Sequence, residues 1–261
     1  MIKANFHMHT PRCGHAQGSE REYIESAIKN GYKVIGFSDH TPQPYPDGIV
    51  SGMRMGMDEL DNYIGVIKEL SKEYEKDIKI YIGLEVEYYP NCWNKLLVEL
   101  RKRDIDYIIM GQHHVKEEFG GFYSGAPTDD IQKVKDYVDV VIEGLKTGAF
   151  IYLAHPDLIN YTGPDDLYIN EMTRLCRFTK ENDIPLEVNM LGFETNRNYP
   201  CDRFFKLASD MGNTFVIGCD AHSPEWMVQP EDVPGLMEFM DRNNIVLEQD
   251  IIEKRIVASV L

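Results

Sequence analysis

The fold is decided by a pattern first met in Ile2-Lys3-Ala4-Asn5-Phe6-His7-Met8-His9, where a short apolar run ends in two histidines. Six more short apolar runs follow, separated by longer amphipathic stretches. We expect β-strands at residues 2–6, 33–37, 78–84, 105–110, 150–154, 186–190 and 214–218. We expect helices at residues 20–30, 58–76, 93–103, 129–147, 168–181, 199–211, 233–243 and 251–261. This alternation predicts a parallel α/β architecture, and seven units favour a barrel or a distorted barrel. No GxGxxG or GxxxxGK[ST] motif supports a nucleotide-binding fold.

Composition favours one folded, soluble domain. The 261 residues are 43% hydrophobic, enough for a large core, and carry a formal net charge of −16. Such an acidic surface repels the backbone of long nucleic acids. There is no signal-peptide core and no apolar stretch of the roughly 18 residues that span a membrane. The five cysteines form no Cys-x-x-Cys pair. We therefore expect a single catalytic domain over residues 1–261, reduced thiols, a cytoplasmic location and no membrane partner, while the oligomeric state stays open.

Histidines and acidic side chains gather where the expected strands end. In chain order these residues are His7, His9, His15, Asp39, His40, Glu85, Glu87, His113, His114, His155, Asp220 and His222. In a parallel β/α barrel the C-terminal strand ends share one face, where active sites form. Residues as distant as His7 and His222 are therefore expected to converge on one site.

The residue types at this face are those of a transition-metal site. Neutral imidazole and carboxylate bind Zn²⁺, Mn²⁺ or Fe²⁺, and a carboxylate can bridge two ions. Because side chains on a strand alternate, His7-x-His9 presents both imidazoles on one side, and Asp220-x-His222 repeats this spacing. We expect two to three divalent ions. The cysteines are expected in the core, although Cys13 lies close to the cluster.

Three assignments stay open from the residues alone. His113 and His114 are adjacent and point opposite ways on an extended chain, so one is expected to bind metal and the other to be packed or exposed. Asp39 and Asp157 are candidates to orient ligand imidazoles, with turn or capping aspartates as the alternative. The Pro-, Gly- and Met-rich segment at residues 41–57 is a candidate cover for the site.

These residues resemble the motifs of the PHP (polymerase and histidinol phosphatase) superfamily. The matching segments appear in the family's order between residues 5 and 223: His7-Met8-His9-Thr10-Pro11-Arg12-Cys13-Gly14-His15, Ser38-Asp39-His40, Gly83-Leu84-Glu85-Val86-Glu87-Tyr88, Gly111-Gln112-His113, His155-Pro156-Asp157 and Gly218-Cys219-Asp220-Ala221-His222. Within the superfamily the chain looks most like the stand-alone histidinol-phosphatases. The doubled histidine at 113–114 departs from the pattern and leaves the register open by one residue; we favour His113.

The resemblance implies a distorted (β/α)7 TIM-like barrel with up to three metal ions. By this analogy the first ion is held by His7, His9, Glu85 and Asp220, the second by Glu85, His113 and His155, and the third by His15, His40 and His222. Glu85 is then a bridging ligand. The residues expected to take part in catalysis are Glu85, Asp220 and Asp39.

The implied activity is hydrolysis of a small phosphate ester, L-histidinol phosphate, to L-histidinol and phosphate. The alternatives are the same chemistry on nucleotides or oligonucleotides, and a non-catalytic metal-binding module. A guanidinium suits the phosphate oxygens that metals leave uncompensated. The candidates for substrate binding are Arg197, Arg12 and Arg54, of which Arg197 is favoured because the sixth strand contributes no expected metal ligand.

Overall fold

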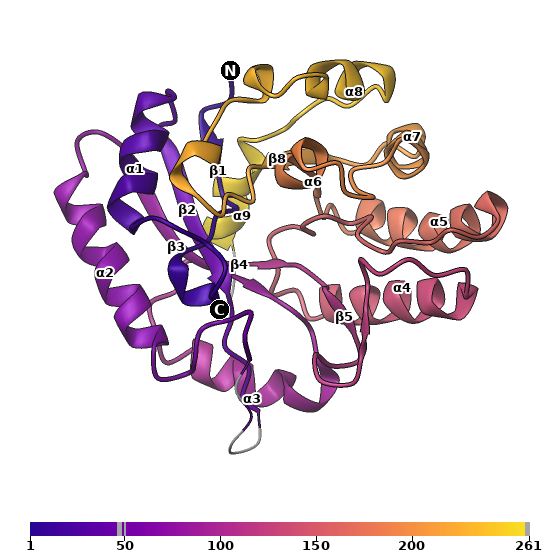
Figure 1. Ribbon diagram of the computed structural model, residues 1–261, viewed down its shortest axis with the longest axis horizontal. Helices are drawn as coiled ribbons and strands as arrows, with labels where there is room; N and C mark the ends of the chain where they lie inside the picture. Colours follow the sequence, from indigo (N-terminus) through magenta and orange to yellow (C-terminus); the bar gives the residue numbers. More distant parts are fainter. Residues whose placement is uncertain (46–48, 50, 259–261) are drawn as a thin grey trace.

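The strands of the protein stand in a ring, with helices around the outside (Figure 1). The computed structural model describes residues 1–45, 49 and 51–258. Parts of the expected cover at 41–57 and of the expected helix at 251–261 lie outside these residues. Among the described residues, no helix has the length and apolar character needed to cross a membrane.

Neighbouring strands of the ring pair in parallel. The strands β1 (Ala4–Asn5), β2 (Val34–His40), β3 (Lys79–Val86) and β4 (Tyr107–Met110) form one sheet in that order. The strands β7 (Leu186–Asn189) and β8 (Phe215–Gly218) form a second parallel pair. Three isolated bridges join the sheets: Leu153 pairs with Met110 on one side and with Leu186 on the other, and Met8 pairs with Ala221. These contacts confirm the expected α/β barrel.

The barrel departs from a regular one at its fifth segment. The expected strand at 150–154 is reduced to the bridging residue Leu153, so that prediction was wrong in element type although right in position. Its neighbours remain buried, and the amide of Ile151 donates to Ile108 while the amide of Ala154 donates to Met110. The segment is buried on both faces, which favours a strand-like run of apolar residues. Its pairing with the neighbouring strands is nevertheless limited to one bridging residue.

The expected helices are present with shifted ends, and all but the last lie around the outside of the barrel (Figure 1). Their observed bounds are α1 (Glu20–Lys29), α2 (Leu60–Glu73), α3 (Pro90–Leu100), α4 (Ile131–Leu145), α5 (Asp165–Glu181), α7 (Asp202–Asp210), α8 (Leu236–Arg242) and α9 (Ile251–Ala258). Helix α1 shows why such ends could be predicted. Ser19 and Glu22 form a reciprocal capping box at its start, and Gly31 follows its end with a φ of 84°.

One end of the barrel is closed by apolar side chains. Ile252 and Ile256 of α9 belong to the same buried cluster as Ala4, Phe6 and Val216 of the barrel. Figure 1 shows α9 lying behind the central strands. This packing leaves the opposite, C-terminal strand ends to form a site.

Three short elements at that face were not predicted. They are the antiparallel hairpin of β5 (His114–Val115) and β6 (Phe122–Tyr123), and helix α6 (Met190–Glu194). Each is too short to give a periodic sequence signal.

Candidate metal centre

The C-terminal strand ends bring a dense group of imidazoles and carboxylates together. In one part of it, Nε2 of His7 lies 3.7 Å from Glu85 Oε2 and 3.4 Å from Asp220 Oδ1. Nε2 of His9 lies 3.6 Å from Glu85 Oε2 and 3.0 Å from Asp220 Oδ1. These four residues are buried, although they come from segments far apart in the chain.

These separations fit ligands that share one ion. Two nitrogen or oxygen ligands of a tetrahedral zinc ion stand roughly 3.4 Å apart, since each is about 2.0–2.2 Å from the metal. Nε2 of His7 is buried and has no hydrogen-bond partner among the described residues. Buried polar atoms are almost always satisfied. The donor set and this unpaired nitrogen therefore fit a divalent cation.

Glu85 extends from this group to a second one. Its Oε1 lies 2.8 Å from Nε2 of His155 and 3.6 Å from Nε2 of His113. Gly111 makes room for this carboxylate, because a Cβ at that position would stand 1.9 Å from Oε1. Glu85 thus faces both groups, as a bridging ligand must.

The remaining histidines lie beside the first two groups. Ligand atoms of His9, His40 and His222 lie within 4.8 Å of one another, as do those of Cys13, His15 and His222. Nδ1 of His15 and Nδ1 of His222 each contact the carbonyl oxygen two residues earlier, which fixes both rings. His40 Nδ1 is also 2.8 Å from Glu85 Oε2. The third set is therefore interleaved with the first.

The side chains of His113 and His114 point in different directions, as expected for adjacent residues of an extended chain. His113 faces the cluster and lies 4.8 Å, centroid to centroid, from the ring of His155. His114 instead begins β5, and its Nδ1 lies 3.4 Å from Glu87 Oε1. The geometry thus favours His113 as the ligand.

Protonation states suit metal binding. Burial lowers the pKa of His40 and His222 to about 3 and that of His113 to about 4, so their lone pairs are free at neutral pH. Burial by itself raises the pKa of Glu85, but electrostatic interactions with the surrounding histidines, that with His113 first, and a hydrogen bond with His155 hold it well below the usual value. Burial likewise opposes protonation of His9, yet hydrogen bonds to Asp220 and Asp39 raise its pKa to about 9. A cation can take the place of that proton.

Glu187 is a site residue that the sequence reasoning missed. Its Oε1 lies 2.8 Å from Nδ1 of His7, and its Oε2 accepts from the backbone amide of His155 and from Asn189 Nδ2. It thus orients one candidate ligand and fixes the backbone of another. The sequence does contain a sign of this role, because Glu187 is a carboxylate within the apolar strand β7. It lies two residues before Asn189, so both side chains are on the same face of the strand.

The two aspartates flagged as orienting residues behave differently. Asp39 Oδ1 lies 3.4 Å from Nδ1 of His9, while its Oδ2 accepts from the backbone and hydroxyl of Thr10. Asp39 therefore combines an orienting contact with a turn contact. Asp157 instead accepts from the backbone amide of Cys201, the residue that precedes α7, so it serves as a capping aspartate.

A cavity of about 320 Å³ opens onto the cluster. His15, His40, His113, Asp220 and His222 line it together with Arg197 and Tyr199. Its other walls are Met53, Tyr123, Leu191 and Trp226. This volume accommodates a small molecule and excludes a folded macromolecule.

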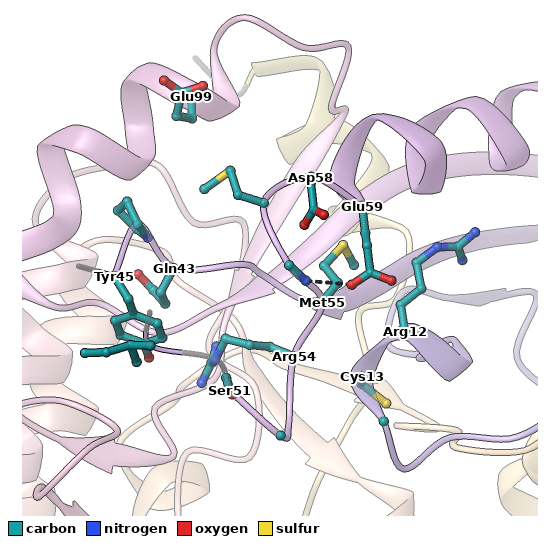
Figure 2. A pocket seen from close by; sticks show the side chains of 16 residues that line it. Arg12, Cys13, Gln43, Tyr45, Ser51, Arg54, Met55, Asp58, Glu59 and Glu99 are labelled. Atoms are coloured by element: carbon teal, nitrogen blue, oxygen red, sulfur yellow. Dashed lines mark hydrogen bonds between the residues drawn. The ribbon is translucent and has the colours of Figure 1, made fainter. Parts of the chain in front are cut away.

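The three arginine candidates occupy different settings. Arg197 lines this cavity, donates to the Tyr199 hydroxyl at 2.8 Å, and has no carboxylate partner among the described residues. Arg12 pairs with Glu20, and Arg54 is buried between two glutamates. Figure 2 shows Arg12 and Arg54 on different sides of a neighbouring cavity of about 840 Å³. Of the three, Arg197 alone borders the cavity that His15, His40, His113, Asp220 and His222 line.

Comparison with known proteins agrees with the family resemblance of the sequence motifs. A model of the PHP domain family matches residues 5–191. The "Probable histidinol-phosphatase" of Deinococcus radiodurans is 28% identical over 230 residues, 84% of this chain and 85% of that protein. The histidinol-phosphatase of Bacillus subtilis is 38% identical over 92 residues, 34% of each chain. The crystal structure of histidinol phosphate phosphatase from Lactococcus lactis, complexed with zinc, L-histidinol and phosphate, matches with a TM-score of 0.72 at 18% identity, covering 94% of this chain and 95% of that one.

Proposed function

Because the chain belongs to the PHP domain family, we propose that it is a metal-dependent phosphomonoesterase that hydrolyses L-histidinol phosphate to L-histidinol and phosphate. The observation that carries the proposal is the cluster of histidines, Glu85 and Asp220 beside a small cavity that Arg197 lines. Relatives named histidinol-phosphatase support this choice of substrate. The five free cysteines agree with a cytoplasmic enzyme of histidine biosynthesis.

We propose two to three zinc, manganese or iron ions per chain. The ligands proposed are His7, His9, Glu85 and Asp220 for the first, Glu85, His113 and His155 for the second, and His15, His40 and His222 for the third. Such ions lower the pKa of a bound water and offset the charge that develops on phosphate oxygens.

The protein's own groups complete the chemistry around this centre. Glu187 and Asp39 hold the rings of His7 and His9, which leaves the Nε2 atoms facing Glu85 and Asp220. Fixed ligands avoid reorganisation as the reaction proceeds.

Arg197 is proposed to bind the phosphate. A guanidinium offers two parallel N–H donors to phosphate oxygens, and Tyr199 holds one of its nitrogens in place. The apolar side chains of Met53, Leu191 and Trp226 line the same cavity and are placed to limit the water around the ester.

The proposal is tested by phosphate release from a panel of esters. The panel contains L-histidinol phosphate, nucleoside monophosphates, phosphotyrosine and a short oligonucleotide with a terminal phosphate. We expect the highest kcat/KM for L-histidinol phosphate, and no release by Glu85→Gln prepared in parallel. A higher kcat/KM for a nucleotide would reassign the substrate, and no release from any ester by metal-loaded protein would refute the proposed activity.

A further inference from the structure

Arg54 has an unusual position for a surface-loop arginine. It belongs to the segment before α2, yet its side chain is only 2% exposed. Three of its nitrogens point to three different acceptors. Nη1 donates to the carbonyl of Thr41 at 3.1 Å, Nη2 pairs with Glu87, and Nε pairs with Glu118 at 2.7 Å.

Each acceptor belongs to a segment that carries a candidate ligand. Thr41 follows His40, and both its amide and its hydroxyl donate to the carbonyl of Glu85 at 2.9 Å. Glu87 lies two residues after Glu85 on the chain that leaves β3. Its Oε1 accepts from the backbone amide of His114 at 2.9 Å, which fixes the residue after His113.

The third contact anchors the hairpin that follows His113. Glu118 lies in the turn between β5 and β6, and it also accepts from the hydroxyls of Tyr45 and Ser51. In Figure 2 the side chains of Tyr45, Ser51 and Arg54 lie along one wall of the larger cavity. One guanidinium therefore joins the ends of β2 and β3, the β5–β6 hairpin and the segment before α2.

The charges make this junction depend on arginine. Glu87 and Glu118 are buried carboxylates, and Arg54 is the cation between them. Buried carboxylates without a cation repel each other and must move, be solvated or take up protons. A lysine retains the charge, but its single ammonium cannot present three donors in the fixed plane of a guanidinium.

We propose that Arg54 is a positioning residue for the metal centre, which fixes the segments of His40, Glu85 and His113 through Thr41, Glu87 and Glu118. The proposal rests on the metal centre of the proposed function. Arg54 touches none of the candidate ligands, so its effect passes through the backbone and Glu87. Retention of metal is then coupled to this ion-pair network.

The test uses Arg54→Lys in the full-length protein loaded with Zn²⁺. The first readout is the rate at which zinc passes to an excess of a chromophoric chelator, and we expect loss at least roughly tenfold faster than from wild type. The second is the rise in Tm when Zn²⁺ is added to metal-free protein, which we expect to shrink in the variant. An arginine that only stabilises the fold would lower the Tm of both forms equally and leave the loss rate unchanged, and that result overturns the proposal.

Two further variants keep the test decisive. Arg103→Lys is the matched control, because Arg103 also joins two carboxylates, Asp61 and Glu99, away from the cluster; its zinc loss should equal that of wild type. Equal acceleration in this control would overturn the specific role of Arg54. If Arg54→Lys does not fold, Glu118→Gln removes one arm of the junction and should still speed zinc loss, and an unchanged rate would overturn the proposal. Wild type that binds no zinc would refute the proposed function as well, which separates the two failures.

Discussion

Replacing Glu187 by glutamine tests how far the metal centre depends on a residue that binds no ion in our account. The carboxylate accepts from four donors: His7 Nδ1 at 2.8 Å, the His155 amide at 3.0 Å, Asn189 Nδ2 at 3.0 Å and the Tyr152 hydroxyl at 3.4 Å. Gly218 makes room for this carboxylate, because a Cβ at that position would stand 2.0 Å from Oε1.

Either orientation of the new amide has a cost. If its NH₂ faces His155 and Asn189, buried donors oppose each other, at about 1–3 kcal/mol for each unsatisfied group. If its NH₂ faces His7, Nδ1 must accept a hydrogen bond and the ring proton moves to Nε2. That nitrogen faces Glu85 and Asp220 and then has no lone pair for a metal. Since about 1.4 kcal/mol is tenfold, we expect metal affinity to fall roughly tenfold to hundredfold.

The assay is competition for zinc with a chromophoric chelator, together with metal content after dialysis and kcat/KM. Glu143→Gln is the control, because Glu143 lies on α4 and accepts from the Tyr88 hydroxyl, away from the cluster. Far-ultraviolet circular dichroism establishes that both variants fold. A folded Glu187→Gln protein with wild-type zinc affinity would show that orientation of His7 contributes little.

Three further predictions concern the ligands, the phosphate and pH. Glu85→Gln should abolish phosphate release and remove at least one ion per chain by elemental analysis, while the fold survives; full metal content would refute the bridging role. Arg197→Ala should lower kcat/KM at least roughly tenfold, about 1.4 kcal/mol, with unchanged metal content, and Arg197→Lys should recover little; near-normal kcat/KM would remove Arg197 from phosphate binding. Burial places the folded pKa values of three histidines at about 3 to 4, below the ordinary 6.5, so the unfolded chain binds more protons between these values. The Tm of metal-free protein should therefore fall as pH is lowered from about 6.5 to 4, and a constant Tm would contradict these shifts; the residues concerned are His40, His113 and His222.

The barrel and the gathering of the ligands could be predicted because both follow from local pattern. Apolar runs set the strand positions, and parallel strands send their C-terminal ends to one face. His7 and Asp220 needed only this rule to be placed together. The segment at 150–154 was assigned as a full strand because burial on both faces selects apolar residues, whereas its backbone bonds to the neighbouring segments leave only Leu153 as a bridging residue.

What could not be predicted depends on contacts between distant side chains. Glu187 lies within an expected strand, and its role depends on a 2.8 Å contact with Nδ1 of His7, which is 180 positions away in the chain. Arg54 was a candidate for phosphate binding because it lies in the segment at residues 41–57 that was expected to cover the site. Its actual partners, Glu87 and Glu118, follow it by 33 and 64 positions, and no local motif links the three.

The most direct test of the account is phosphate release from L-histidinol phosphate as a function of bound metal. Chelator-treated protein is titrated with Zn²⁺, Mn²⁺ or Fe²⁺ while the ions per chain are counted by elemental analysis. A metal-dependent reaction requires no release from metal-free protein and full activity at two to three ions per chain. Full activity with fewer than one ion per chain would contradict it.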